Sequence, residues 1–271
     1  MANARSGGCY DAHAVPRAPA NRRGFIRELR LDRTKAGALD AYPYTIPAIA
    51  SLETLKLDPA VTIFVGENGS GKSTLVEAIA VRAGFNAEGG SRHFAFSTRA
   101  SQSSLHEALV LVRNARREKT GFFLRAESLF NVATIAEQLG LGRYGWEALH
   151  EKSHGEAFLW LLEERFGPNG LYVLDEPEAA LSPQRQLAAL AIFHRLVAAG
   201  SQLVIATHSP ILMGYPGALL YRLDAAGIAR VAYEETEHYT VTRGFLTSPE
   251  RYLKHLLHDD LEADPGAGDE D

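Results

Sequence analysis

Short hydrophobic runs recur along the chain, and a polar turn with a helical pattern follows three of them. The three runs are residues 61–65, 171–174 and 202–206, and they are rich in β-branched and aromatic residues. Continuous apolar runs of this kind predict strands that are buried on both faces, as in a largely parallel sheet with helices on either side. The pattern therefore predicts an α/β fold, in which ligands bind at the carboxyl ends of the strands.

The remaining hydrophobic pattern predicts further strands and helices around these three strands. The additional strands are expected over 25–31, 121–126, 219–224 and 228–233, and the last two should form a hairpin. Helices are expected over 74–80, 127–150, 153–166, 182–199 and 248–258. The segment 105–116 fits either a helix or a strand.

A glycine-rich loop connects the strand over 61–65 to the helix over 74–80. Its sequence, GENGSGKST, fits the phosphate-binding pattern G-x-x-x-x-G-K-[ST]. Glycines allow consecutive backbone N–H groups to point inward around a phosphate, and the following helix N-terminus adds the positive end of its dipole. A glycine turn with a chance lysine is the alternative, which the flanking strand and helix disfavour. The nucleotide-binding residues predicted here are Gly66, Glu67, Asn68, Gly69, Ser70, Gly71, Lys72, Ser73 and Thr74.

Two residues of this loop and two acids further along the chain predict the chemistry of the site. Lys72 can reach the β- and γ-phosphates of ATP, and the Ser73 hydroxyl can bind Mg²⁺. Asp175 follows the strand over 171–174 and can hold the same Mg²⁺ ion, usually through water. Glu176 comes next and can polarise the attacking water as a general base. The alternative for the two acids is a helix cap followed by a solvated carboxylate.

His208 lies just past the third of the hydrophobic strands. A histidine at this point can sense the γ-phosphate by hydrogen bonding and help to place the water. A capping or core histidine is the alternative. We therefore predict Lys72, Glu176 and His208 as catalytic residues, and Ser73 and Asp175 as metal ligands.

Composition and charge are those of an ordinary globular protein. Charged residues make up 23% of the 271 residues, and the formal net charge of −5 arises largely in residues 259–271, which hold seven acids and no lysine or arginine. The middle of the chain is nearly neutral, so its net charge does not indicate binding to nucleic acid. The net charge does not exclude a local basic patch. We expect 1–21 and 259–271 to be disordered tails and 22–258 to be the folded ATPase domain.

The chain has the features of a cytoplasmic protein. Cys9 is the single cysteine, so no disulfide can form within the chain, which suits a reducing cytosol. No secretory signal is visible, and a membrane-spanning helix is not expected, because the uncharged stretch 203–221 contains prolines and glycines. One small basic cluster is more typical of a solvated face than of a binding patch. It consists of Arg113, Arg116, Arg117 and Lys119.

Five motifs occur along the chain in the order GENGSGKST, SHGE, LYVLDEPE, ALSP and IATHSP. This set resembles that of the ABC-type ATPases: phosphate loop, signature motif, metal-binding acid with catalytic glutamate, D-loop and switch histidine. More closely, the sequence from about 25 to 257 resembles the small stand-alone bacterial "AAA family ATPase" proteins, which are related to RecF and SMC heads. The resemblance implies a P-loop NTPase with the ABC-type ATPase head architecture, a mostly parallel sheet flanked by helices, and a small helical subdomain near 127–166.

The resemblance also implies roles for residues outside the phosphate loop. Ser153 and Gly155 occupy the position of the signature motif, which in ABC ATPases contacts the γ-phosphate bound to the other subunit. The implied active form is an ATP-dependent homodimer with two ATP molecules in its interface, which the D-loop residues 181–182 would also cross. Two departures from the pattern stand out. His154 replaces a glycine of the transporter signature, and a clear Q-loop glutamine is missing, with Glu127 as the best candidate for that place.

Three functions follow as hypotheses. The first is a cytosolic ATPase that uses ATP and Mg²⁺ in DNA maintenance or defence, by an analogy at the level of fold. The second is the ATPase subunit of a transport system, which the altered signature and the missing glutamine disfavour. The third is a non-catalytic nucleotide-gated interaction module, which Glu176 disfavours. The span from 84 to 153 is too short for a coiled-coil arm of the SMC type, and the sequence identifies neither a nucleic acid nor a protein partner.

Overall fold

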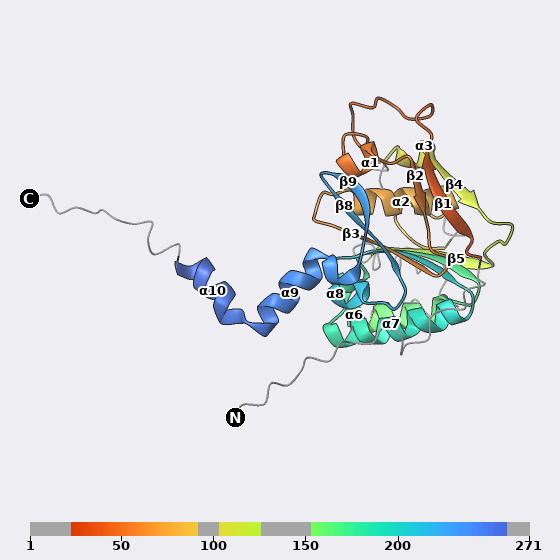
Figure 1. Cartoon of the computed structure of the whole chain (residues 1–271). Helices are drawn as coiled ribbons and strands as arrows, with labels where there is room; N and C mark the ends of the chain where they lie inside the picture. Colours follow the sequence, from red (N-terminus) through yellow and green to blue (C-terminus); the bar gives the residue numbers. More distant parts are fainter. Residues whose placement is uncertain (1–22, 92–102, 126–152, 259–271) are drawn as a thin grey trace, which may run out of the picture.

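The computed structural model describes residues 23–91, 103–125 and 153–258 of the chain (Figure 1). A six-stranded sheet with the order β5-β6-β7-β3-β8-β9 lies at its centre. Neighbouring strands run parallel from β5 to β8, and β9 at the edge pairs antiparallel with β8. The strands are β3 (Val61–Val65), β5 (Thr120–Arg125), β6 (Gly170–Asp175), β7 (Gln202–Ala206), β8 (Leu219–Asp224) and β9 (Gly227–Val231). The predicted α/β fold with a mostly parallel sheet is therefore confirmed.

Helices cover both faces of this sheet. Helix α2 (Lys72–Ala83) lies on one face, and α6 (His154–Arg165) and α7 (Pro183–Ala198) lie on the other (Figure 1). Successive residues of β3 alternate between the two faces, because Ile63 packs in the core that includes α6 and α7, whereas Phe64 packs in the core that includes α2. This burial on both sides explains why the strands are continuous hydrophobic runs.

A second, smaller sheet lies beside α2 and was not predicted. It has the order β2-β1-β4 and is antiparallel. Its strands are β1 (Ile26–Leu31), β2 (Thr54–Lys56) and β4 (Leu109–Arg113), and the short helices nearby are α1 (Pro47–Ala50) and α3 (Leu105–Ala108). The segment 105–116, which fitted either a helix or a strand, contains one of each.

Gln202 joins the two sheets. Its side chain is fully buried, and its Oε1 atom accepts hydrogen bonds from the backbone N–H groups of Phe25 and Ile26 at 2.8 and 2.9 Å. Its Nε2 atom donates to the backbone carbonyls of Ile26 and Asp58 at 2.7 and 2.9 Å. Because a buried amide is stable only when its hydrogen bonds are made, these four bonds hold the small sheet against the start of β7.

Two helices at the C-terminal end of the described chain project from the body (Figure 1). They are α9 (Glu237–Thr247) and α10 (Pro249–His258), and they follow the short elements η2 (Pro177–Ala180), α8 (Pro210–Met213) and η3 (Tyr233–Glu235). The last helix was predicted, but α9 was missed, because its β-branched residues and Gly244 lower its helix propensity. Helix α9 begins where the Thr236 side chain accepts a hydrogen bond from the backbone N–H of Tyr239 at 3.4 Å.

The helices predicted over 153–166 and 182–199 are confirmed as α6 and α7. Helix α6 packs into the main core beside α7, and the rest of the predicted helical subdomain, the tails 1–21 and 259–271 and Glu127 lie outside the described residues. Among the described residues, no helix combines the length and the apolar character that crossing a membrane requires.

Candidate active site

The phosphate-binding pattern occupies the turn between β3 and α2, as the sequence predicted. Gly71 precedes the first residue of α2 with a φ of 97°, and Gly66 follows β3 with a φ of 149°. A Cβ atom at Gly66 would lie 2.2 Å from the carbonyl oxygen of Leu223 in β8. A Cβ atom at Gly71 would lie 2.9 Å from the Ile46 side chain. Glycine is therefore needed at both ends of the loop, because a side chain would push the loop away from its neighbours.

Replacing Gly66 with alanine should lower the free energy of unfolding by about 2 kcal/mol, because the new Cβ atom meets a backbone carbonyl and the positive φ is strained. The matched control is Gly69→Ala. Gly69 also has a positive φ, of 80°, but no atom lies within 4 Å of its Cβ position. The control should lose only about 1 kcal/mol. Denaturant unfolding of both variants measures the difference, and equal losses would contradict the close approach of the loop to β8.

Lys72 folds back over the loop. Its Nζ atom donates hydrogen bonds to the carbonyl oxygens of Gly66 at 2.9 Å and Glu67 at 2.8 Å, and the residue is 3% exposed. Burial lowers the pKa of Lys72, and the charges of Glu176 and Asp175 oppose that effect. The ammonium group thus lies between the loop and the two acids at the carboxyl end of β6, where it can bind an anion.

A small cavity of about 260 Å³ opens on the outer side of the loop. It is lined by Tyr42, Ile46, Asn68, Gly69, Gly71, Lys72, Ser73, Thr74 and Glu176. Two buried polar atoms near the loop, Ser70 Oγ and His208 Nε2, have no hydrogen-bond partner among the described residues. Phosphate oxygens are acceptors that would satisfy such donors, and an unsatisfied buried donor costs about 1–3 kcal/mol. The residues present therefore fit a nucleoside triphosphate.

Ser73 and Asp175, the predicted metal ligands, lie side by side. The Ser73 hydroxyl donates to Asp175 Oδ1 at 2.9 Å. The other carboxylate oxygen of Asp175 lies 3.4 Å from Nε of Arg125, which also pairs with Glu77 at 2.8 Å. A hydroxyl and a carboxylate are oxygen ligands of the kind that Mg²⁺ prefers. The sequence reasoning missed Arg125, although it ends the strand that pairs with β6 in register with Asp175.

Glu176 and His208 meet where β6 and β7 end. Glu176 follows β6 in the left-handed region with a φ of 49°, which is uncommon for a residue with a side chain. Its Oε1 atom lies 3.6 Å from Nε2 of His208. Strained backbone of this kind often occurs at functional sites, where it aims a side chain into the site.

Two further residues contact His208 that the sequence reasoning missed. Oε1 of Glu178 accepts a hydrogen bond from the backbone N–H of His208, and burial raises the pKa of Glu178. On the other side, Nε2 of His238, the second residue of α9, lies 3.1 Å from Nδ1 of His208. Glu178 belongs to the same motif, LYVLDEPE, as Glu176, so the motif could have indicated that Glu178 lies near the site. His238 was assigned no role, because the hydrophobic pattern does not indicate that α9 returns to β7.

The surroundings lower the pKa of both histidines, which favours their neutral form. Burial lowers the pKa of His208, the positive charge of Lys72 lowers it further, and Glu176 opposes these effects. Burial and Lys72 also lower the pKa of His238, against the opposing charges of Glu237 and Glu67. Since the ordinary value for histidine is already about 6.5, each ring carries one proton on one of its two nitrogens at neutral pH.

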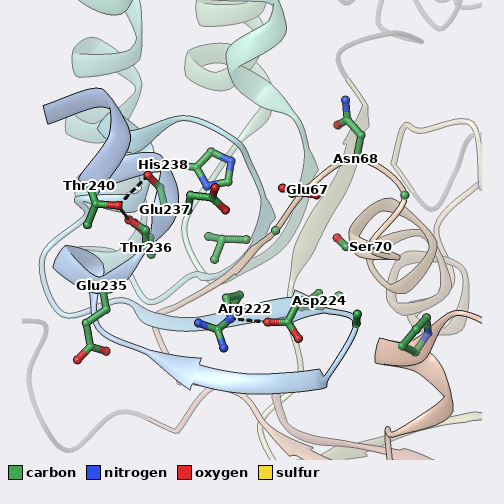
Figure 2. Close-up of a pocket in the computed structure, with 16 residues that line it drawn as sticks. Glu67, Asn68, Ser70, Arg222, Asp224, Glu235, Thr236, Glu237, His238 and Thr240 are labelled. Carbon is green, nitrogen blue, oxygen red and sulfur yellow. Dashed lines mark hydrogen bonds and ion pairs between the residues drawn. The ribbon is translucent and has the colours of Figure 1, made fainter. Parts of the chain in front are cut away.

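Two larger cavities separate the loop from the start of α9. Figure 2 shows Glu237 and His238 of α9 across one cavity from Glu67 and Asn68 of the loop. The second cavity is also lined by Glu176 and His208. The cavities measure about 670 and 730 Å³. The start of α9 therefore forms a wall of the same site as the loop.

Ser153 and Gly155 do not line any of these three cavities. Ser153 is exposed and caps α6, because its backbone N–H donates to Glu156 Oε2 at 3.0 Å. Arg185 of α7 lies 3.1 Å from Glu156 and 3.3 Å from Ser153 Oγ, and its own N–H donates to Ser182 at 3.4 Å. A Cβ atom at Gly155 would lie 2.9 Å from the carbonyl oxygen of Ala180. The predicted signature and D-loop residues thus adjoin one another outside these cavities, with Ser153 and Ser182 exposed and Gly155 and Leu181 buried.

Two tyrosines that precede the loop, Tyr42 and Tyr44, and the basic cluster differ in their exposure and contacts. Tyr42 is 63% exposed and lines the small cavity, whereas Tyr44 is buried, so only Tyr42 is accessible to a nucleotide base. Arg113 pairs with Glu118 at 2.8 Å, and Arg116 donates to the carbonyl oxygen of Gly200 at 3.1 Å. These two arginines are therefore engaged in contacts within the protein, rather than forming the fully solvated face that was expected.

Comparisons with known proteins find two family models that match parts of this chain. A family model described as "AAA domain" matches residues 48–110, and one described as "AAA domain, putative AbiEii toxin, Type IV TA system" matches residues 156–214. No curated protein matches the chain. The structure of the "SMC head domain from Thermotoga maritima" is similar, with 15% identity, a TM-score of 0.44 and coverage of 77% of this chain and 99% of that chain. So is the "Structure of ATP binding subunit of ABC transporter", with 17% identity, a TM-score of 0.43 and coverage of 78% and 91%.

The two matched segments contain every residue of the phosphate loop, both acids after β6 and His208. Ser153 and Gly155 lie just before the second segment. Over these two segments the chain is similar in sequence to AAA domains, and the loop between β3 and α2 has the geometry of a phosphate-binding loop.

Proposed function

We propose that the protein binds ATP with Mg²⁺ and hydrolyses it as an ATP-sandwich homodimer. One observation carries the proposal. Lys72, the Ser73–Asp175 pair, Glu176 and His208 come from three separate strand ends and meet around one loop. Such a meeting of cation, metal ligands, carboxylate and imidazole is what phosphoryl transfer to water requires.

Each residue has a distinct role in this proposal. Lys72 and the loop N–H groups would hold the β- and γ-phosphates. Ser73 and Asp175 would hold Mg²⁺, which when bound neutralises charge on the phosphates. Glu176 would accept a proton from the attacking water, and His208 would donate from Nε2 to the γ-phosphate. Tyr42, exposed beside the loop, is our candidate for stacking on the adenine.

The exposed Ser153 at the start of α6 supports the homodimer. Ser153 has no role in the site of its own chain, yet its hydroxyl is accessible and held by Arg185. The backbone N–H of Arg185 also donates to the Ser182 hydroxyl. The signature and D-loop residues are therefore fixed relative to one another. In the proposed dimer, Ser153 and Gly155 of one copy complete the site of the other.

We further propose that ATP turnover serves DNA maintenance or defence. The second family match, to an AAA domain described as a putative AbiEii toxin of a type IV toxin–antitoxin system, supports the defence role. The transport subunit and the non-catalytic module remain as the other hypotheses, and the measurements below separate them.

The purified protein should hydrolyse ATP in the presence of Mg²⁺, and EDTA should abolish the reaction, because the Ser73–Asp175 pair needs the ion to act on the phosphates. Turnover should be measured alone and with single- and double-stranded DNA. Stimulation by DNA would support the maintenance or defence role. Stable ATP binding without any turnover would favour the non-catalytic module, and co-purification with an integral membrane protein would favour the transport subunit.

A further inference from the structure

The backbone and the imidazole of His208 are each held by a residue that the reaction does not use directly. Glu178 accepts a hydrogen bond from its backbone N–H, and the ring of His238 lies beside its own ring, with centroids 5.3 Å apart. The Nδ1 atom of His208 and the Nε2 atom of His238 are 3.1 Å apart. The remaining nitrogen of His208, Nε2, is buried and has no hydrogen-bond partner in the described part of the chain. It is therefore the atom left for a ligand.

A hydrogen bond between two neutral imidazoles needs one donor and one acceptor. Either His238 donates from Nε2 to the lone pair on Nδ1 of His208, or His208 donates from Nδ1 to His238. In the second case, the Nε2 lone pair of His208 would face the Glu176 carboxylate oxygen at 3.6 Å, and two electron-rich atoms repel. In the first case an N–H group faces that carboxylate, which is favourable. Electrostatics therefore selects the first arrangement.

We propose that His238 is a positioning residue for His208. The Nε2–H group of His238 donates to Nδ1 of His208 and fixes the tautomer in which the Nε2–H of His208 points toward Glu176 and the nucleotide. The importance of this contact for turnover rests on the proposed function. The tautomer itself is a property of the protein without nucleotide, and it can be tested separately.

The fold holds His238 in place through a short chain of contacts. Thr236, just before α9, is buried and donates from its hydroxyl to the Tyr233 carbonyl oxygen at 2.7 Å. The Tyr233 hydroxyl donates to the carbonyl oxygen of Pro210 at 2.8 Å. Pro210 begins α8, two residues after His208. The start of α9 is thus tied to the segment that carries His208, so a shift of α9 would change the His208–His238 contact.

The tautomer can be read by nitrogen NMR of the full-length protein with ¹⁵N-labelled histidine, without nucleotide and at neutral pH. In the wild type, His208 should carry its proton on Nε2 and an unprotonated Nδ1. In His238→Leu, which removes the donor, His208 should become a mixture of tautomers. His238→Gln should keep the wild-type tautomer, because the glutamine amide can donate from nearly the same place. His194→Leu, a histidine loss on α7 outside the site, is the control and should leave the signal unchanged.

Two results would overturn the proposal. One is a wild-type His208 protonated at Nδ1, and the other is an unaltered His208 tautomer in His238→Leu. Thermal unfolding of each variant shows whether it is folded, and the glutamine variant provides the answer if the leucine variant is not.

Kinetics give a second readout on the same proteins. In His238→Leu, kcat for ATP should fall by up to about 100-fold, because the donor to the γ-phosphate is misplaced. KM should change little, because the loop and Lys72 hold the nucleotide, and His238→Gln should recover most of the loss. An equal loss in the glutamine and leucine variants would mean that His238 acts by packing alone and would refute the positioning role. If the wild type hydrolyses no ATP, the proposed function fails, while the NMR result still decides the tautomer.

Discussion

Replacing Glu176 with glutamine should leave ATP binding intact, lower kcat by about 1,000-fold and trap a dimer with ATP. Glutamine has the shape of glutamate but cannot accept the proton of the attacking water. The Glu176 side chain is 37% exposed and lies 3.6 Å from Nε2 of His208, so the neutral amide can occupy its place without a packing defect. Because ATP would no longer be consumed, the closed dimer should accumulate.

Turnover, nucleotide affinity and mass by light scattering should be measured on the same preparation. The matched control is Glu163→Gln, which makes the same chemical change at an exposed carboxylate that pairs with Arg195 at 3.5 Å on the far helices. This control should behave as the wild type. A Glu176→Gln protein that stays monomeric at saturating ATP would rule out the sandwich dimer, even if its turnover is lost.

The parts of the site that the sequence predicted are those carried by local motifs. The loop 66–74 follows a hydrophobic strand and opens a helix, so its place at a strand end could be deduced from neighbours in the chain. The same reasoning placed Asp175, Glu176 and His208 at the ends of two further strands. Because the carboxyl ends of parallel strands share one edge of a sheet, the meeting of these residues followed from the predicted fold.

The parts that were missed depend on contacts between elements far apart in the chain. Arg125 reaches Asp175 because β5 and β6 pair in register, and neither the order of strands nor the register is visible in the hydrophobic pattern. The small antiparallel sheet was missed for the same reason, since β1 pairs with β4, a strand that lies far from it in the chain. His238 was missed because α9 itself was not predicted and because nothing local brings it to β7.

Ser153 shows a different limit of sequence reasoning. The motif around it predicted a role in the site, yet in the single chain it caps α6 and contacts Arg185. A residue that acts in the site of a second copy leaves no trace in the contacts of one chain. The dimer prediction therefore depends on solution measurements, of which the trapped state of Glu176→Gln is the most direct.

Replacing Lys72 with alanine should weaken ATP binding by about 100-fold, which corresponds to about 2.7 kcal/mol. The Nζ atom of Lys72 donates to two backbone carbonyls of the loop, at 2.9 and 2.8 Å. Those bonds hold the ammonium group over the loop, where a phosphate oxygen would be its partner. A charge-assisted hydrogen bond is worth about 1.5–3 kcal/mol, which is the size of the expected loss.

Calorimetric titration with ATP and Mg²⁺ measures this affinity, and Lys35→Ala, at an exposed lysine that pairs with Asp32, is the control. The Lys72 and Glu176 variants also test each other, because one should lose ATP binding and the other should keep it. Lys72→Ala should lose both binding and the ATP-dependent dimer, whereas Glu176→Gln should keep both and lose turnover. A general folding defect cannot produce that pair of results, since it would weaken all three properties in both variants. Unchanged ATP affinity in a folded Lys72→Ala protein would mean that the loop does not bind the phosphates.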